Sequence, residues 1–238
     1  MRERRNAVPG DAVCHPVFAR FYARFSVAAD TGAGVAAHRA ELLSGLSGRV
    51  VEIGAGNGLN FAHFPSAVSE VVAIEPEPAL RALARGAAAR SEVPVDVVPG
   101  LAEALPLKSE AFDGAVCSLV LCSVRDVGRA LGEVMRVLRP GGELRFFEHC
   151  RAGTRGLAAV QRAVDRTVWP LLFGGCHTAR DPVAEIGSAG FVLGVHRRLR
   201  VPERGIAVPT SPCVLGVARR PFPGAEARAG EAEPGGGA

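Results

Sequence analysis

The feature that most constrains the fold is an alternation of short apolar runs with longer amphipathic segments, which begins at Arg49. This alternation is typical of a parallel sheet whose strands are joined by crossover helices. Helices are expected at residues 60–64, 78–89 and 125–138. The predicted strands cover residues 50–53, 71–74, 96–98, 114–121, 143–148, 191–196 and 213–218. We therefore predict an α/β domain built on one sheet.

The regions before and after this alternation have a different composition. Residues 1–48 contain two further helical candidates, at 17–28 and 36–46, and are predicted to form an N-terminal helical cap. Residues 49–220 form the main domain. Residues 221–238 are rich in Pro, Gly, Ala and Glu, and we predict a disordered tail because they offer little apolar surface to offset the entropy of ordering.

Helical spacing places four aromatic residues on one side of the first predicted helix, namely Phe18, Phe21, Tyr22 and Phe25. A stripe of this kind is more often buried than exposed, so we expect it to face the core. A helix that gates the substrate or lies on a membrane is the alternative.

The net charge does not point to a nucleic-acid partner. The formal charge is +4, but the basic residues are almost all arginine, with Lys108 the single lysine. Together with frequent Ala, Gly and Pro, this bias is typical of coding sequence from a GC-rich bacterial genome. The densest basic stretch, from Arg197 to Arg204, is interpreted as a solvated face beside a late strand.

The six cysteines lie far apart, without a CxxC pair or a closely spaced Cys/His group. Such local spacing marks structural zinc sites, so no metal site is expected. Cysteines in apolar runs behave as small hydrophobic residues, and we predict a reducing, cytoplasmic location. No segment reaches the roughly 18 to 20 uninterrupted apolar residues that span a bilayer, so a soluble protein is expected.

A glycine-rich turn follows the first predicted strand, with the sequence Glu52-Ile53-Gly54-Ala55-Gly56-Asn57-Gly58. Where such a turn enters a helix, its backbone N–H groups favour an anionic ligand. The dinucleotide fingerprint G-x-G-x-x-G requires a third glycine at position 59, where this chain has Leu59. S-adenosylmethionine has no pyrophosphate, and Glu52 is suited to the ammonium of its methionine end.

A second carboxylate ends the next predicted strand. Glu75 lies 21 residues after Gly54 and is followed by Pro76. A carboxylate at this strand end can accept both ribose hydroxyl protons, in NAD and in S-adenosylmethionine alike. Glu75 therefore indicates an adenosine site without choosing the cofactor.

Two further motifs identify a family. Ala111-Phe112-Asp113 precedes the fourth strand, and Val137-Leu138-Arg139-Pro140-Gly141-Gly142 precedes the fifth. With the turn and Glu75, these motifs resemble the class I S-adenosylmethionine-dependent methyltransferases of the type 11 group, over about residues 49–148. The resemblance implies a Rossmann-like seven-stranded sheet, mostly parallel with one antiparallel late strand and with helices on both faces. It also implies S-adenosyl-L-methionine as the cofactor.

The resemblance further implies which residues bind the cofactor. The turn would contact the methionine end, Glu75 the ribose, residues 101–103 the adenine, and residues 118–119 would close the pocket. Many relatives have an aspartate for the adenine amino group where this chain has Leu101, so adenine contact through backbone groups or Glu103 is expected. The expected set is Glu52, Gly54, Gly56, Gly58, Asn60, Glu75, Pro76, Leu101, Ala102, Glu103, Ser118 and Leu119.

A finer resemblance covers most of residues 15–219 and concerns the methyl acceptor. Residues 58–61, 117–124, 147–149, 169–173, 175–176 and 178–180 look like a methyltransferase-like group that includes the membrane-associated alkyl thiol S-methyltransferases of animals. Those animal proteins begin with a membrane-anchoring apolar helix, which is missing here. No stable membrane span is therefore expected.

A thiol acceptor reacts as the thiolate, which a nearby base or cation can provide. His149, just past the fifth strand, and His177, in a Gly-Gly-Cys-His loop, are the candidate catalytic residues. For each of them, a loop histidine bonded to backbone is the alternative. Arg180 is suited either to an anionic acceptor or to pairing with Asp181 or Glu185.

Three residues near these histidines have less specific roles. Trp169 and Phe173 either line an apolar acceptor pocket or belong to the core. Cys122 lies near the expected cofactor pocket, but direct transfer requires no covalent step.

The predicted function is methyl transfer to a small-molecule acceptor, with a thiol as the first candidate. The alternatives are O-, N- or C-methylation of a lipid-like or quinone-like metabolite, and a nonenzymatic cofactor-binding subunit.

Overall fold

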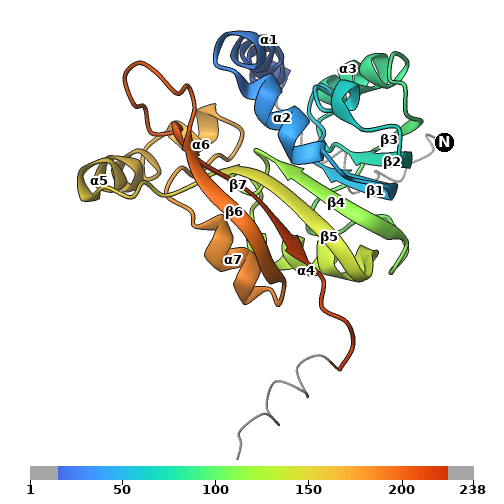
Figure 1. The fold of residues 1–238 in the computed structure, drawn as a ribbon. Coiled ribbons are helices and arrows are strands. Elements are labelled where there is room, and N and C mark those ends of the chain that lie inside the picture. The colour runs from blue at the N-terminus through green and yellow to red at the C-terminus, as the bar shows by residue number, and fades with distance from the viewer. Residues whose placement is uncertain (1–15, 225–238) are drawn as a thin grey trace, which may run out of the picture.

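The computed structural model describes residues 16–224 and confirms the predicted α/β sheet (Figure 1). Within these residues, seven strands form one sheet in the order β3-β2-β1-β4-β5-β7-β6. Strand β7 is antiparallel to both of its neighbours, and the other pairs are parallel. The strands are β1 (Gly48–Ile53), β2 (Val68–Ile74), β3 (Val95–Val98), β4 (Phe112–Ser118), β5 (Leu138–His149), β6 (Val192–Arg200) and β7 (Pro212–Arg219).

Helices cover both faces of this sheet (Figure 1). They are α1 (Pro16–Gly32), α2 (Val35–Leu43), the 3-10 helix η2 (Phe61–His63), α3 (Pro78–Ala88), α4 (Val127–Val137), α5 (Arg155–Val164), α6 (Trp169–Leu172) and α7 (Pro182–Ser188). Helices α4 and α7 share one apolar cluster with β1 residues Val51 and Ile53. Helices α2 and α3 share the opposite cluster with Val50. Because side chains alternate along a strand, Glu52 belongs to the α2 face.

Several elements differ from the predictions. Strand β2 begins at Val68, strand β6 extends to Arg200, and the helix predicted at 60–64 is the short 3-10 helix η2. Strand β4 ends at Ser118 rather than at residue 121, because Leu119 turns out of the extended conformation with a φ of +56°. Strand β5 begins at Leu138, directly after α4, since Leu138 already pairs with Phe112. Helices α5, α6 and α7 occupy a region for which no element was predicted.

The expectation that the aromatic stripe of α1 faces the core is wrong for two of its members. Phe21 and Phe25 are 50% and 58% exposed. Tyr22, by contrast, lies against the glycine turn at Gly56. Phe18 lies outside the described side chains. Helical spacing identifies residues that share a face, but it does not tell which face another layer covers.

The ends of the chain are only partly within the described residues. Residues 1–15 of the expected cap and 225–238 of the expected tail lie outside them, and the division into cap, domain and tail stays a prediction. Among the described helices, none is long and apolar enough to cross a bilayer. The basic stretch begins on the exposed strand β6, where Arg197 pairs with Glu41 of α2, and Arg204 follows that strand.

Candidate cofactor and acceptor site

The glycine turn leaves β1 in a conformation that other residues rarely adopt. Gly54, Gly56 and Gly58 have φ angles of +67°, +58° and +81°. A Cβ atom at Gly54 would lie 2.4 Å from Val120 Cγ2, and one at Gly56 would lie 3.2 Å from the Tyr22 ring. The turn is therefore a bare backbone surface, bordered by α1 and by the loop after β4, which a ligand can approach closely.

Glu52 lies one residue before the end of β1, beside this turn, and is 2% exposed. Its Oε1 accepts a hydrogen bond from Asn60 Nδ2 at 2.7 Å, and its Oε2 has no hydrogen-bond partner among the described residues. Burial raises the pKa of Glu52 to about 7. A buried carboxylate oxygen with free lone pairs fits the ammonium of a methionine end.

Arg39 of α2 organises this part of the site, and the sequence analysis missed it. Its guanidinium donates to Asp30 Oδ1 at 2.8 Å, to Asn60 Oδ1 at 2.8 Å and to Ser118 Oγ at 3.2 Å. By occupying the oxygen of Asn60, Arg39 turns the amide nitrogen toward Glu52. No local motif signals this role, because Arg39 lies in the segment interpreted as a helical cap.

Glu75 is found at the end of β2, as predicted, and is 5% exposed. Its Oε2 accepts from the backbone N–H of Gly56 at 2.7 Å, and its Oε1 accepts from that of Glu77 at 2.9 Å. Burial raises the pKa of Glu75 to about 7. Each oxygen has a further lone pair, so the carboxylate can brace the turn and still accept ribose hydroxyl protons.

The residues that were expected near the adenine make different contacts in the structure. Pro76 accepts from Arg81 through its carbonyl, and Ala102 packs into the apolar core, while Leu101 forms an isolated bridge with Ala104. Glu103 Oε1 accepts from the backbone N–H of Arg125 at 2.9 Å. Its carboxylate thus holds the start of the segment before α4, and the backbone of residues 101–103 is the better candidate for adenine contact.

The loop after β4 is held in a strained shape by Glu148. Leu119 has a positive φ, which is unusual for a non-glycine residue and costs of order 1–3 kcal/mol. Glu148 is fully buried, and its Oε1 accepts from the N–H groups of Val120 and Leu121, both at 3.0 Å. Burial raises the pKa of Glu148 to about 7. The sequence identified Ser118 and Leu119 but not this buried support.

The same loop is held from its carbonyl side by Arg180. The guanidinium donates to the carbonyl oxygens of Leu121 and Val124, the latter at 2.8 Å. Neither predicted role, an anionic acceptor or a pair with Asp181 or Glu185, describes these bonds. His177 Nδ1 lies 2.7 Å from the Gly175 carbonyl of its own loop, so the structure favours the backbone-bonded alternative for this histidine.

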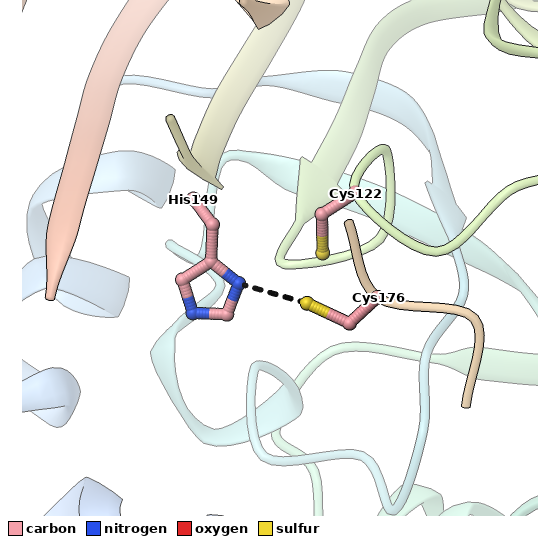
Figure 2. A group of neighbouring side chains, drawn as sticks. All are labelled: Cys122, His149 and Cys176. Carbon is pink, nitrogen blue, oxygen red and sulfur yellow. Dashed lines mark hydrogen bonds between the residues drawn. The ribbon is translucent and has the colours of Figure 1, made fainter. Parts of the chain in front are cut away.

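His149 is brought together with two cysteines that were not expected to be close. Figure 2 shows the side chains of Cys122, His149 and Cys176 pointing toward one another, with Cys176 Sγ 3.7 Å from His149 Nδ1. One ligand atom from each lies within 4.8 Å of the others, and both cysteines are buried. Burial alone would lower the pKa of His149, but Cys122 and Glu148 raise it above its usual value. We name these three residues the Cys-His-Cys cluster.

Aromatic residues of α1 and α6 form an apolar group beside this region. The Trp169 and Phe173 rings stack at 3.8 Å, and Phe173 meets Phe21 edge to face at 6.1 Å. Leu171 of the same helix is 83% exposed. Phe173 also accepts, through its carbonyl, from the backbone N–H of Cys176, so the aromatic group adjoins the Cys-His-Cys cluster.

Comparison with known proteins settles the family. The "Methyltransferase domain" family matches residues 51–146. The chain is 33% identical over 190 residues to thiol S-methyltransferase TMT1A of Homo sapiens, covering 75% of this chain and 77% of that protein. It belongs to the class I S-adenosylmethionine-dependent methyltransferases. A malonyl-[acyl-carrier protein] O-methyltransferase of Methylococcus capsulatus is 35% identical over 152 residues, covering 60% of this chain and 51% of that protein.

Solved structures agree with the fold of this methyltransferase. A SAM-dependent methyltransferase of Thermotoga maritima, described as a possible histamine N-methyltransferase, superimposes with a TM-score of 0.62 at 24% identity and covers 86% of this chain and 98% of its own. A methyltransferase structure from Bacillus halodurans gives a TM-score of 0.61 at 16% identity, over 78% of this chain and 98% of its own. These likenesses confirm the predicted Rossmann-like sheet.

S-adenosylmethionine is the cofactor of this family, and the residues at the turn fit it. When bound, it supplies an electrophilic methyl group on a sulfonium. The structure gathers part of the predicted set around the turn: Glu52, Gly54, Gly56, Gly58, Asn60, Glu75, Ser118 and Leu119. Glu103 is the predicted residue whose carboxylate is turned to another segment.

Proposed function

We propose that this methyltransferase transfers its methyl group to the sulfur of a small-molecule thiol. The observation that carries the proposal is the Cys-His-Cys cluster at the carboxyl ends of β4 and β5, next to the loop that borders the glycine turn. In open α/β sheets this edge holds the ligands. The human relative named for thiol S-methylation, which the chain matches over 77% of its length, supports the same acceptor.

On this proposal the cofactor half of the site binds and orients. Glu52 Oε2 would accept from the ammonium of the methionine end, and Glu75 would accept from the ribose hydroxyls. The backbone at 101–103 borders the adenine, and the loop at Leu119 closes the pocket. Holding the reacting atoms in line and excluding water is the main contribution of a protein to methyl transfer.

The acceptor half has to hold a sulfur atom in its thiolate form. Arg180 is committed to the carbonyls of Leu121 and Val124, and His177 faces its own loop. Of the protein's own side chains within the described residues, His149 is therefore the one placed to take the thiol proton. The neighbouring rings of Phe21, Trp169 and Phe173 suit an alkyl or aryl chain on that sulfur.

The test is a competition among acceptor classes. The full chain is incubated with S-adenosylmethionine and, separately, an alkyl thiol, a phenol, an amine and a hydroquinone, and each methylated product is identified by mass spectrometry. Methylation of the thiol, with formation of an equal amount of S-adenosylhomocysteine, is the expected outcome. Products from the phenol or the hydroquinone, without any thioether, would assign the enzyme to O- or C-methylation instead.

Two further predictions belong with this proposal. The five cysteines within the described residues are free thiols, which supports the expected reducing, cytoplasmic location. The expectation of no nucleic-acid partner stays a prediction of this proposal.

A further inference from the structure

The Cys-His-Cys cluster has the composition of a transition-metal site. Two thiols and one imidazole are ligands that zinc prefers, and a Cys2His set with an open fourth position is a known form of catalytic zinc site. The three residues come from three segments, each separated by 27 residues from the next, so local spacing does not reveal them. The expectation of no metal site depended on that local spacing alone.

The distances suit an ion at the centre of the cluster. A tetrahedral zinc with bonds of about 2.3 Å to sulfur and about 2.0 Å to nitrogen separates a sulfur from the nitrogen by about 3.5 Å and two sulfurs by about 3.8 Å. Cys176 Sγ lies 3.7 Å from His149 Nδ1, and the ligand atoms of all three residues lie within 4.8 Å of one another. Small side-chain rotations would complete three bonds.

The backbone around the cluster is already fixed, as a metal site requires. Cys122 lies in the loop held by Glu148 and Arg180 from its two sides, with its own N–H 3.4 Å from Glu148 Oε2. A Cβ atom on Gly175 would lie 2.7 Å from the Ser123 carbonyl oxygen, so a glycine is needed for the Cys176 loop to pack against the Cys122 loop. His149 is the last residue of β5, which lies between β4 and β7 in the sheet.

We infer that Cys122, His149 and Cys176 bind a zinc ion whose fourth position takes the acceptor thiol. The identity of the acceptor in this inference rests on the proposed function, whereas the metal site does not. Among the described residues the cluster offers three ligands, which leaves one tetrahedral position for the substrate. The aromatic group that adjoins Cys176 then receives the organic part of the thiol.

The reaction at such a site balances without a further reagent. The thiol binds zinc as a thiolate and releases its S–H proton to solvent. Its sulfur lone pair forms the new S–CH3 bond as the bond from the methyl carbon to the sulfonium breaks, and that electron pair stays on the sulfur of S-adenosylhomocysteine. The product thioether is a weak ligand and leaves the ion.

The first experiment measures metal content rather than activity. The full, untagged chain is produced with zinc in the medium, desalted, and analysed by elemental mass spectrometry. About one zinc ion per chain is expected, falling at least tenfold in Cys122→Ser, Cys176→Ser and His149→Ala. Cys213→Ser is the matched control, because Cys213 is equally buried outside the cluster and a serine hydroxyl there can use the Thr210 carbonyl. Equal zinc in the wild type and in all three cluster variants would overturn the inference.

A second measurement covers variants that fail to fold. Cobalt(II) added to the chelator-treated wild-type chain is expected to give the visible absorption of a tetrahedral thiolate site, and an added alkyl thiol is expected to change that spectrum. An unchanged spectrum would make the ion structural and overturn the open position. A Cys122–Cys176 disulfide formed on mild oxidation in a protein that takes up neither metal would also overturn the zinc site.

Activity then separates this inference from the proposed function. If thiol turnover is the same before and after chelation, the thiol acceptor is supported and the zinc site is contradicted. If the chain binds one zinc ion but forms no thioether from any thiol, the metal site is supported and the proposed acceptor is contradicted.

Discussion

The two halves of the site, at the same edge of the sheet, are assembled in different ways. The cofactor half takes its glycine turn and both carboxylates from the continuous stretch 52–75. The proposed acceptor half takes Cys122, His149 and Cys176 from three segments joined only by the fold. A continuous motif fixes one ligand, whereas a discontinuous cluster can change residue by residue. This difference agrees with relatives that share the cofactor domain and are named for thiol, O- and C-methylation.

The largest effect should come from the backbone of the cofactor half. In Gly54→Ala, a Cβ atom has to fit 2.4 Å from Val120 in a residue with positive φ, so we expect a loss of about 2–5 kcal/mol of stability and at least a hundredfold loss of cofactor affinity. Thermal unfolding and calorimetric titration measure both. Gly86→Ala, in α3 with no heavy atom closer than 4.0 Å, is the control and should gain about 0.5–1 kcal/mol. Normal cofactor binding by Gly54→Ala would contradict the close-approach role of the turn.

Arg39→Met should show that the cofactor half also depends on a residue outside its continuous motif. Arg39 is 6% exposed, and its removal leaves Asp30, Asn60 and Ser118 without a shared partner. Breaking a buried pair of this kind costs about 3–5 kcal/mol. We expect that loss in denaturant unfolding, with weaker cofactor binding. Arg197→Met removes the exposed pair with Glu41 and should cost less than about 0.5 kcal/mol. Equal losses of stability in the two variants would show that Arg39 has no special role in the site.

The pH dependence should separate binding from folding in the cofactor half. Burial raises the pKa of Glu52 from 4.5 to about 7, so its contribution to folding stability is full below the lower value and is lost as pH rises through the higher one. Binding of an ammonium needs the carboxylate, so affinity should instead rise over the same interval. Titration at several pH values should show this rise in the wild type and a shallower, roughly tenfold weaker profile in Glu52→Gln, in which Glu75, whose pKa burial also raises to about 7, still titrates. Glu70→Gln, from the surface pair with Arg49, should keep the wild-type slope, and a Glu52→Gln profile as steep as that of the wild type would assign the effect elsewhere.

The smallest effect should come from the aromatic border of the acceptor half. Phe173→Ala removes a half-buried ring that stacks on Trp169, and we expect the KM for a long alkyl thiol to rise about fivefold. Cofactor affinity and the KM for the smallest thiol should stay unchanged. Val195→Ala on β6, 87% exposed, is the control. A change in cofactor affinity in Phe173→Ala would show that the two halves are not separable.

Much of the fold and of the cofactor half could be predicted because their signals are local. Apolar runs identify the strands, and Glu52, Gly54 and Glu75 are tied to strand ends that the sequence already places. Arg39 and Glu148 could not be predicted, since each acts across the fold on Asn60 or on the loop after β4.

The acceptor half was harder to predict from the sequence, because its residues also come together only across the fold. His149 was identified by its place at a strand end, but its neighbours Cys122 and Cys176 are close only after β4, β5 and the loop before α7 come together. The exposed Phe21 and Phe25 illustrate a second limit, because periodicity defines a face without telling what covers it.

The position of α1 has a kinetic consequence. Tyr22 lies against Gly56, and the side chain of Asn57 bonds Ser26 Oγ at 3.1 Å, so this helix rests on the turn through a few contacts while Phe21 and Phe25 face outward. Asp30 of the same helix pairs with the buried guanidinium of Arg39, so moving α1 off the turn also requires breaking this pair. A cofactor that occupies the Gly56 side of the turn meets Tyr22 there, so we expect cofactor exchange to be coupled to movement of α1.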